Sequence, residues 1–168
     1  MLNYICLGVA AVLVAVDQLV KFWAEHSLSQ VDTIALIPGV FHLTYVQNFG
    51  AAFNTMNNQR LLLVVLTSAV LLVIFVLLLL GKLRSPWMVV SWSLILAGGA
   101  GNLIDRLFRE GGYVVDLFDF RLINFPVFNV ADICVTVGMA LFLIYFIFIE
   151  RKEHRRFEIR QEIKRHEQ

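Results

Sequence analysis

Four long apolar stretches limit the fold of this chain more than any other feature of its sequence. They cover residues 4–23, 61–80, 87–104 and 128–149, and each is close to the roughly 20 residues that an α-helix needs to cross a bilayer. Only 16% of all residues are charged, whereas soluble domains have about 25%. We therefore predict one membrane domain over residues 1–168, an all-α bundle of four transmembrane helices.

A cleaved signal peptide is the alternative interpretation of the first apolar stretch. A signal peptide has basic residues before its apolar core and a small-residue cleavage motif after it. No basic residue precedes residues 4–23, and no convincing cleavage motif follows them. We therefore expect this stretch to be a retained transmembrane helix.

The uneven distribution of basic residues predicts the orientation of the chain in the membrane. With four spans, both termini share one side with the turn at 82–84, and this side holds nine of the 14 Lys and Arg residues. The nine are Lys82, Arg84, Arg151, Lys152, Arg155, Arg156, Arg160, Lys164 and Arg165. The positive-inside rule then places both termini in the cytoplasm, with outer loops over 24–60 and 105–127. The tail, 150–168, is expected to be a solvated helix along the inner leaflet, and a specific partner for it is the alternative.

The first outer loop has a different pattern, which predicts a small β element. Phe41, Leu43 and Tyr45 occupy alternate positions, as in a half-buried strand. Residues 33–37 form a candidate partner strand, and a Pro-Gly turn at 38–39 separates the two. We expect a small extracytoplasmic sheet or hairpin that rests on the membrane surface.

The region from Ala97 to Asp132 places ionisable residues between apolar spans, and the functional site is expected there. A charged group at membrane depth costs roughly 2.5–3.5 kcal/mol on insertion scales, so such residues indicate function. Asp116 lies among bulky apolar residues, and Asp132 lies at the start of the fourth span, three residues after Asn129. Residues three apart share one face of a helix.

Asp116 and Asp132 are the candidate catalytic residues. Two carboxylates in a partly dry site cannot both ionise easily, so one keeps a proton and the pair supplies an acid and a base. Such a pair is sufficient for peptide hydrolysis without a covalent intermediate. The sequence does not show that the two carboxylates meet, and a helix N-terminus that is merely stabilised by its charge is the alternative role for Asp132.

Asn102 and Arg106 are further candidates, because they are four residues apart and share a helical face. The small residues Ala97–Gly101 precede them and allow a second backbone to approach closely. The structural alternative is a helix-packing seam that an Asp105–Arg106 pair caps.

Asp17 and Lys21 are also four residues apart, within the first span. The favoured interpretation of this pair is structural, because opposite charges at this spacing neutralise each other inside the membrane. Asn48 precedes the apolar segment Phe49–Phe53, which is either a lipid-contacting loop or a turn.

Other chemistries find little support in the sequence. It has no His-Glu-x-x-His metal motif and no Gly-x-Ser-x-Gly elbow. Cys6 and Cys134 lie inside apolar runs and have no metal-ligand spacing. The tail alternates basic with acidic residues, so we expect no binding of nucleic acid. An ion-coupled transporter and a non-enzymatic membrane scaffold remain the alternatives to a hydrolase.

Five motifs, taken in order along the chain, resemble those of bacterial lipoprotein signal peptidase (signal peptidase II), a family of intramembrane aspartyl proteases. They are Asp17-Gln18 with Lys21, Asn48–Phe53, Gly101–Arg106, Val114–Asp116 and Phe128–Asp132. Each motif alone is weak, but five in this order within a four-span layout are highly specific. One departure is that Ala97–Ala100 replaces the Gly-Gly-Ala of many members, which keeps these residues small.

The resemblance implies a reaction and roles for individual residues. The family removes the signal peptide of a prolipoprotein on the N-terminal side of a diacylglyceryl-modified cysteine. By this resemblance Asp116 and Asp132 form the catalytic dyad, whereas Asp105 looks structural and Asp119 lies outside the site. The residues expected to bind substrate or support the site are Asn48, Asn102, Arg106, Asn129, Asp17 and Lys21.

The resemblance also implies the partners and the location. The expected partners are diacylglyceryl-modified prolipoprotein signal peptides and membrane lipid. We expect a monomer without metal or cofactor in the bacterial cytoplasmic membrane, with its active site near the outer face.

Overall fold

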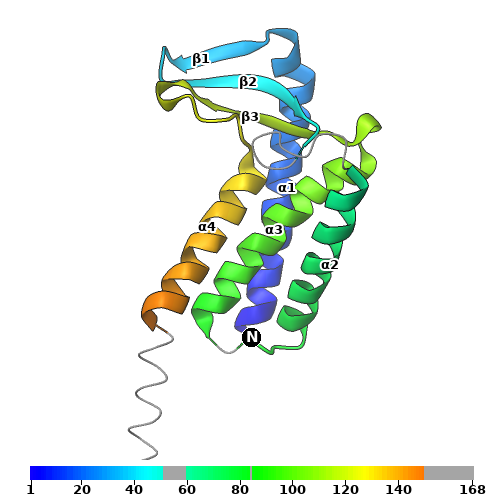
Figure 1. The fold of residues 1–168 in the computed structure, drawn as a ribbon, viewed down its shortest axis with the longest axis vertical. Helices are drawn as coiled ribbons and strands as arrows, with labels where there is room; N and C mark the ends of the chain where they lie inside the picture. The colour runs from blue at the N-terminus through cyan, green and yellow to red at the C-terminus, as the bar shows by residue number, and fades with distance from the viewer. Residues whose placement is uncertain (51–59, 84, 150–168) are drawn as a thin grey trace, which may run out of the picture.

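Four long helices and a small sheet make up most of the chain in the computed structural model, which describes residues 1–50, 60–83 and 85–149 (Figure 1). The helices are α1 (Leu2–Ser27), α2 (Arg60–Leu79), α3 (Pro86–Phe108) and α4 (Val130–Ile144), which a π-helical turn extends over Tyr145–Ile149. All four are long and apolar enough to cross a membrane. The predicted four-helix membrane bundle is therefore confirmed, and the protein is a multi-pass membrane protein.

Two helices extend further at their outer ends than the hydropathy pattern predicted. Helix α1 continues to Ser27 and α3 to Phe108, beyond the expected ends at residues 23 and 104. Polar side chains at these outer ends bond to each other, for example Arg109, which directly follows α3, to Glu25 in α1. The hydropathy pattern marks only the apolar part of a helix. The helical backbone hydrogen bonds continue beyond this part where polar side chains find partners that stabilise the added turns.

The predicted hairpin is present, and it belongs to a sheet of three strands. Strand β1 (Thr33–Ile37) pairs antiparallel with β2 (Phe41–Asn48), and β2 pairs antiparallel with β3 (Val114–Phe120). Gly39 in the intervening turn has φ +74°, a conformation that glycine adopts without strain. The third strand was not predicted, because its sequence, Val114–Phe120, lacks the regular alternation of apolar and polar residues seen at the start of β2.

An irregularity in β2 decides which residues share the face of Asp116. The register shifts between Leu43 and Val46, so that Leu43 pairs with Phe118 and Val46 pairs with Asp116. Side chains alternate along a regular strand, and the extra residue brings Asn48 onto the face of Asp116. The opposite face of β3 packs its Val115 and Leu117 side chains on the outer end of α1 and on the 3₁₀-helix η1 (Leu28–Gln30).

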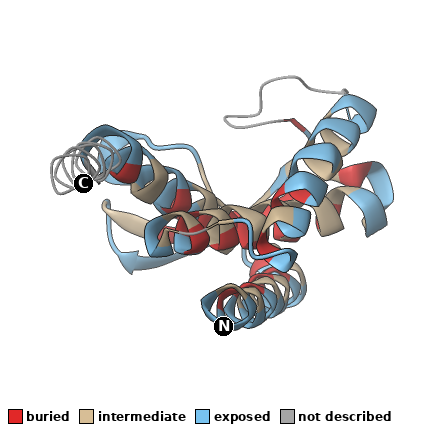
Figure 2. Cartoon of the chain, turned by 90° about the horizontal axis from the view of Figure 1, so that it is seen from below, coloured by how far each residue is buried: buried red, intermediate tan, exposed pale blue. Residues whose placement is uncertain are grey.

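Helix α3 packs against all three other helices, and the small residues predicted as a packing seam lie at these contacts. A methyl group on Gly98 would lie 2.2 Å from the carbonyl oxygen of Ala131 in α4, and one on Gly101 would lie 2.6 Å from Oδ2 of Asp17 in α1. Buried residues gather where the helices meet, and the outward faces are exposed, as expected for surfaces that face lipid (Figure 2).

The sheet lies across one end of the bundle, while the N-terminus and the last described turn of α4 lie at the other end (Figure 1). This arrangement places both ends of the described chain on one side, as an even number of spans requires. The predicted cytoplasmic tail, 150–168, lies outside the described residues, as do residues 51–53 of the predicted apolar segment after Asn48.

Candidate active site

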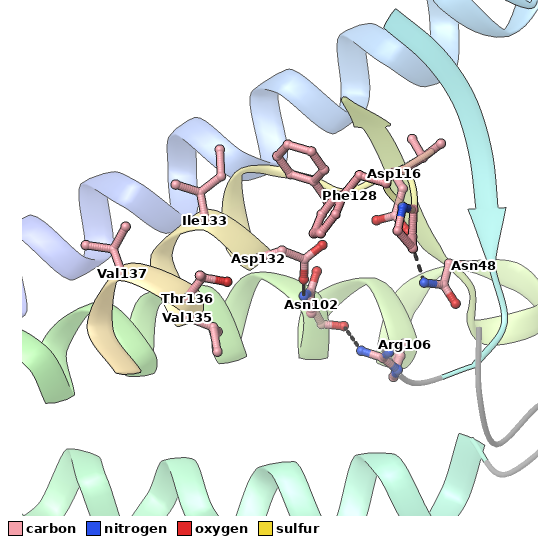
Figure 3. Close-up of a pocket in the computed structure, with 13 residues that line it drawn as sticks. Asn48, Asn102, Arg106, Asp116, Phe128, Asp132, Ile133, Val135, Thr136 and Val137 are labelled. Carbon is pink, nitrogen blue, oxygen red and sulfur yellow. Dashed lines mark hydrogen bonds between the residues drawn. The ribbon is translucent and has the colours of Figure 1, made fainter. Parts of the chain in front are cut away.

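The structure brings Asp116 and Asp132 to one cavity below the sheet (Figure 3). Asp116 extends from β3, and Asp132 lies in the first turn of α4. The cavity has a volume of about 530 Å³. Its lining residues are Asn48, Asn102, Arg106, Asp116, Phe125, Pro126, Val127, Phe128, Asp132, Ile133, Val135, Thr136 and Val137.

Asn129 connects the two carboxylates. Its side-chain Nδ2 donates to Oδ1 of Asp116 at 2.6 Å, and its main-chain N–H donates to Oδ2 of Asp132 at 3.2 Å. Its Oδ1 accepts from the main-chain N–H of Asp132 at 2.9 Å, which completes a capping box at the start of α4. Asp132 therefore stabilises the helix N-terminus, as the alternative interpretation held, and also faces the cavity.

Asn48 and Asn102 each donate to one of the two carboxylates (Figure 3). Nδ2 of Asn48 lies 3.0 Å from Oδ2 of Asp116, and Nδ2 of Asn102 lies 2.8 Å from Oδ1 of Asp132. The amide oxygen of Asn48 accepts from the Gly50 N–H, and that of Asn102 accepts from Lys21 Nζ. Because these donors occupy the amide oxygens, the NH₂ groups are oriented towards the carboxylates.

The surroundings of Asp116 favour its protonated form. Only 2% of this residue is exposed. Burial raises the pKa of its carboxyl to about 7, and the charge of Asp132 adds to this increase. Hydrogen bonds from Asn48 and Asn129 and the charge of Lys21 act in the opposite direction. Asp116 therefore has a pKa suited to holding a proton near neutral pH.

A buried lysine lies behind the cavity wall and orders this part of the bundle. Lys21 has no exposed surface, and its Nζ lies 2.9 Å from Asp17 Oδ2, Asp105 Oδ2 and Asn102 Oδ1. Three N–H donors thus meet three acceptors. The Asp17–Lys21 pair predicted from their spacing forms, and Asp17 Oδ1 also accepts from the main-chain N–H of Ala131 at 2.8 Å. Asp17 thereby fixes the start of α4 to α1.

The alternative that paired Asp105 with Arg106 is wrong. Asp105 lies 3.0 Å from Arg109 and 2.9 Å from Lys21, whereas Arg106 lines the cavity and donates to the carbonyl oxygens of Asn102 and Gly50. Neighbouring residues on a helix point in different directions, so the two side chains have separate partners.

Asp105 contacts the site more directly than the sequence indicated. Its Oδ2 accepts from the main-chain N–H of Val115 at 3.3 Å, and Val115 immediately precedes Asp116. The carbonyl oxygen of Val115 accepts from Asn129 at 3.3 Å. Asp105 thus helps to position the strand that carries Asp116, and only its spacing of four from Arg109 could have suggested a paired role.

The other predicted residues divide into two groups by position. Asn48, Asn102 and Arg106 line the cavity, whereas Asn129, Asp17 and Lys21 lie behind its wall and support it. Thr136 also lines the cavity, one turn below Asp132 on α4, and the sequence analysis had not singled it out.

Asp119 lies on the opposite face of β3 from Asp116. Its Oδ2 accepts from Thr44 and Arg121, each at 2.7 Å. Within the described parts of the chain, no group of three or more His, Cys, Asp or Glu side chains is placed to hold a metal ion.

The chain is similar to curated relatives over most of its length. It is 42% identical over 142 residues to the lipoprotein signal peptidase of Streptococcus thermophilus, covering 84% of this chain and 92% of the relative. It is 39% identical over 148 residues to that of Brevibacillus brevis, with 88% and 97% covered. The Trichormus variabilis protein of the same name is 41% identical over 129 residues, with 77% and 80% covered.

Two solved structures share the fold, and a family model covers most of the chain. Structures described as "Bacterial membrane enzyme structure by the in meso method", at 2.3 Å and 1.9 Å, are each 28% identical to this chain, with TM-scores of 0.78 and 0.75. The matches cover 84% and 86% of this chain, and 87% and 93% of the others. The model of the family "Signal peptidase (SPase) II" matches residues 9–148. The chain therefore belongs to the signal peptidase II family of peptidases.

Proposed function

We propose that this protein is an aspartyl endopeptidase that removes signal peptides from prolipoproteins within the membrane. The observation that carries the proposal is the cavity in which Asp116 and Asp132 meet, bridged by Asn129. The relatives named lipoprotein signal peptidase suggest the substrate class. Cleavage is proposed on the N-terminal side of a diacylglyceryl-modified cysteine.

In the proposed mechanism, Asp132 is the ionised base and Asp116 the protonated acid. Asp132 takes a proton from a water molecule, whose oxygen attacks the scissile carbonyl carbon while Asp116 donates its proton to the carbonyl oxygen. When the tetrahedral intermediate collapses, the C–N bond breaks and the amine nitrogen takes the proton from Asp132. The hydroxyl that becomes the new carbonyl returns a proton to Asp116.

The assignment of acid and base follows from burial, because each carboxylate receives two N–H donors. Asp132 accepts from Asn102 and from the main chain of Asn129, and Asp116 accepts from Asn48 and from the side chain of Asn129. Asp116 is more deeply buried than Asp132, and burial raises the pKa of its carboxyl to about 7. One group is thus ready to accept a proton and the other to donate one.

The composition of the cavity wall suits a lipid-modified peptide. Ile133 and Val137 line the cavity on α4 and are also exposed on its outer surface. The cavity therefore has an apolar side that faces the surrounding lipid, through which acyl chains and an apolar signal helix can enter without crossing water.

The proposed location is the bacterial cytoplasmic membrane, with the site at its outer face and both termini in the cytoplasm. The concentration of Lys and Arg in 82–84 and 150–168 supports this orientation.

Replacing each aspartate by asparagine tests the proposal. Asp116→Asn and Asp132→Asn are each expected to lower the rate of cleavage by about 10²–10⁴-fold, the usual contribution of a general acid or base. The assay measures release of the signal peptide from a diacylglyceryl-modified precursor by purified protein in proteoliposomes. The matched control is Asp119→Asn, which changes the same residue type on the opposite face of β3. Wild-type turnover in either cavity variant would contradict the mechanism.

A further inference from the structure

Four exposed apolar side chains lie at one end of the sheet, two at the end of β1 and two in a neighbouring 3₁₀-helix. Leu36 and Ile37 end β1 and are 53% and 54% exposed, and Leu122 and Ile123 in η4 (Arg121–Ile123) are 63% and 65% exposed. We call these four residues the apolar tip. None of them lines the cavity, so the proposed reaction leaves the tip without a role.

Backbone hydrogen bonds connect the two segments that carry the tip. The carbonyl oxygen of Val40, in the turn after β1, accepts from the main-chain N–H groups of Arg121 and Leu122 at 2.9 and 3.4 Å. Phe125 N–H donates to Phe120 O at 3.1 Å, which closes the second turn onto β3. The tip is therefore an ordered projection of the sheet, and its exposure is built into the fold.

The chain passes from the tip directly into a membrane-spanning helix. Residues 124–129 connect Ile123 to the start of α4, and Phe125 in this connection packs edge-on against Phe128 and lines the cavity. In Figure 1 the tip lies at the free end of the sheet, beyond the outer end of α4. A connection of six residues therefore joins the tip to the start of α4.

Charge is absent from the tip and present beside it. Residues 34–41 and 122–131 contain no Asp, Glu, Lys or Arg. The nearest charged side chains, Asp119 and Arg121, are paired with each other at 2.7 Å. An apolar surface flanked by polar groups is the composition of segments that lie in the interface of a bilayer, whereas an apolar patch facing water is unfavourable.

We propose that the apolar tip inserts into the outer leaflet beside the cavity and anchors the sheet to the bilayer. The partner is the acyl and glycerol region of the lipids around α4, with the Asp119–Arg121 pair at headgroup level. The anchor fixes the height of Asp116, which the sheet carries, relative to the lipid in which a substrate would lie. Insertion of the tip does not depend on the proposed function, because it can be measured without substrate.

The test places an environment-sensitive fluorophore on the tip of the full-length protein in vesicles. Ile123→Cys is labelled with a nitrobenzoxadiazole dye in a chain in which Cys6 and Cys134 are replaced by alanine. The vesicles contain phosphatidylethanolamine and phosphatidylglycerol, with or without a lipid that carries a nitroxide at carbon 5 of its acyl chain. We expect blue-shifted emission, strong quenching by the nitroxide lipid and little quenching by aqueous iodide.

The matched control is Gln30→Cys, an exposed position in η1 at the opposite end of the sheet. Its label should emit as in water and be quenched by iodide. Leu36→Cys supplies a second tip position in case the change at Ile123 disturbs folding, and it should behave as the label at Ile123 does. Iodide quenching at the tip would overturn the proposal. Shielding from both quenchers would also overturn it, because a protein surface would then cover the tip.

Discussion

Two clusters of carboxylates lie side by side at the outer end of this bundle, and they are built differently. Asp17 and Asp105 share the buried Lys21, and Asp105 also pairs with Arg109. In the cavity, Asp116 and Asp132 receive hydrogen bonds from asparagine side chains and main-chain N–H groups. Among the described residues, no salt bridge reaches either of these two.

The difference shows how a membrane protein separates structure from chemistry. A cation beside a buried carboxylate keeps the carboxylate ionised and fixed, which suits a structural role. Neutral donors orient a carboxylate but leave it able to exchange a proton, which suits catalysis. Asn102 joins the two clusters, because its oxygen accepts from Lys21 and its NH₂ group donates to Asp132.

The largest effect on stability is expected when Lys21, the cation shared by Asp17 and Asp105, is replaced. Lys21→Met leaves Asp17 and Asp105 buried beside an apolar side chain, and breaking a buried ion pair typically costs about 3–5 kcal/mol. We expect a large fall in the melting temperature in detergent, followed by loss of expression at the membrane. A stable, active Lys21→Met protein would show that the cation is dispensable.

Asp105→Asn is expected to have an intermediate effect that involves both clusters. The change keeps the size of the side chain but removes the charge that faces Lys21 and Arg109, and it weakens the bond to the Val115 N–H. We expect a lower melting temperature and a lower kcat with little change in KM, because Asp105 does not line the cavity. A change confined to KM would mean that Asp105 acts on substrate binding.

The pH dependence of the reaction should distinguish the two carboxylates of the cavity. The pKa of Asp116 lies near 7, so kcat should fall as the pH rises through this value and the acid loses its proton. Asn48 lowers this pKa by its hydrogen bond, so Asn48→Ala should move the alkaline limb to higher pH. An alkaline limb that stays in place would remove Asp116 from the role of acid.

The same pKa predicts an effect on stability with the opposite sign to that of Lys21→Met. The pKa of Asp116 in the fold is above the value of about 3.9 for a free aspartate. The folded state therefore binds the proton of Asp116 more tightly than the unfolded state does. The stability that this one proton contributes is lost as the pH rises from about 4 through 7. Asp116→Asn cannot ionise, so at pH 8 its melting temperature should be higher than that of the wild type, although it is inactive. An unchanged or lower melting temperature would contradict the unfavourable burial of this charge.

The smallest effect is expected for the ion pair outside both clusters. The Arg121 side chain is 41% exposed, and exposed pairs contribute about 0–1 kcal/mol. Arg121→Gln should therefore leave the melting temperature and the cleavage rate close to those of the wild type. A large loss of activity would show that the Asp119 face of the sheet takes part in the reaction.

The sequence by itself determined the four helices and the hairpin, and it singled out five of the polar residues that line the cavity: Asn48, Asn102, Arg106, Asp116 and Asp132. Hydropathy over some 20 residues is a local property, so it reports a membrane span without knowledge of neighbouring elements. The spacing of four between Asp17 and Lys21 is equally local, and the pair forms. Asp116 and Asp132 stood out because a carboxylate among apolar residues is costly wherever it lies.

Only the tertiary structure decided which of these residues meet. Asp116 and Asp132 come from separate elements, and the third strand that carries Asp116 is paired with residues about 70 positions earlier in the chain. Asp105 faces Lys21 instead of Arg106 because the packing of α1 on α3 provides a buried cation on that side. Contacts between distant elements depend on how helices and strands pack, and the sequence within one element does not contain that information.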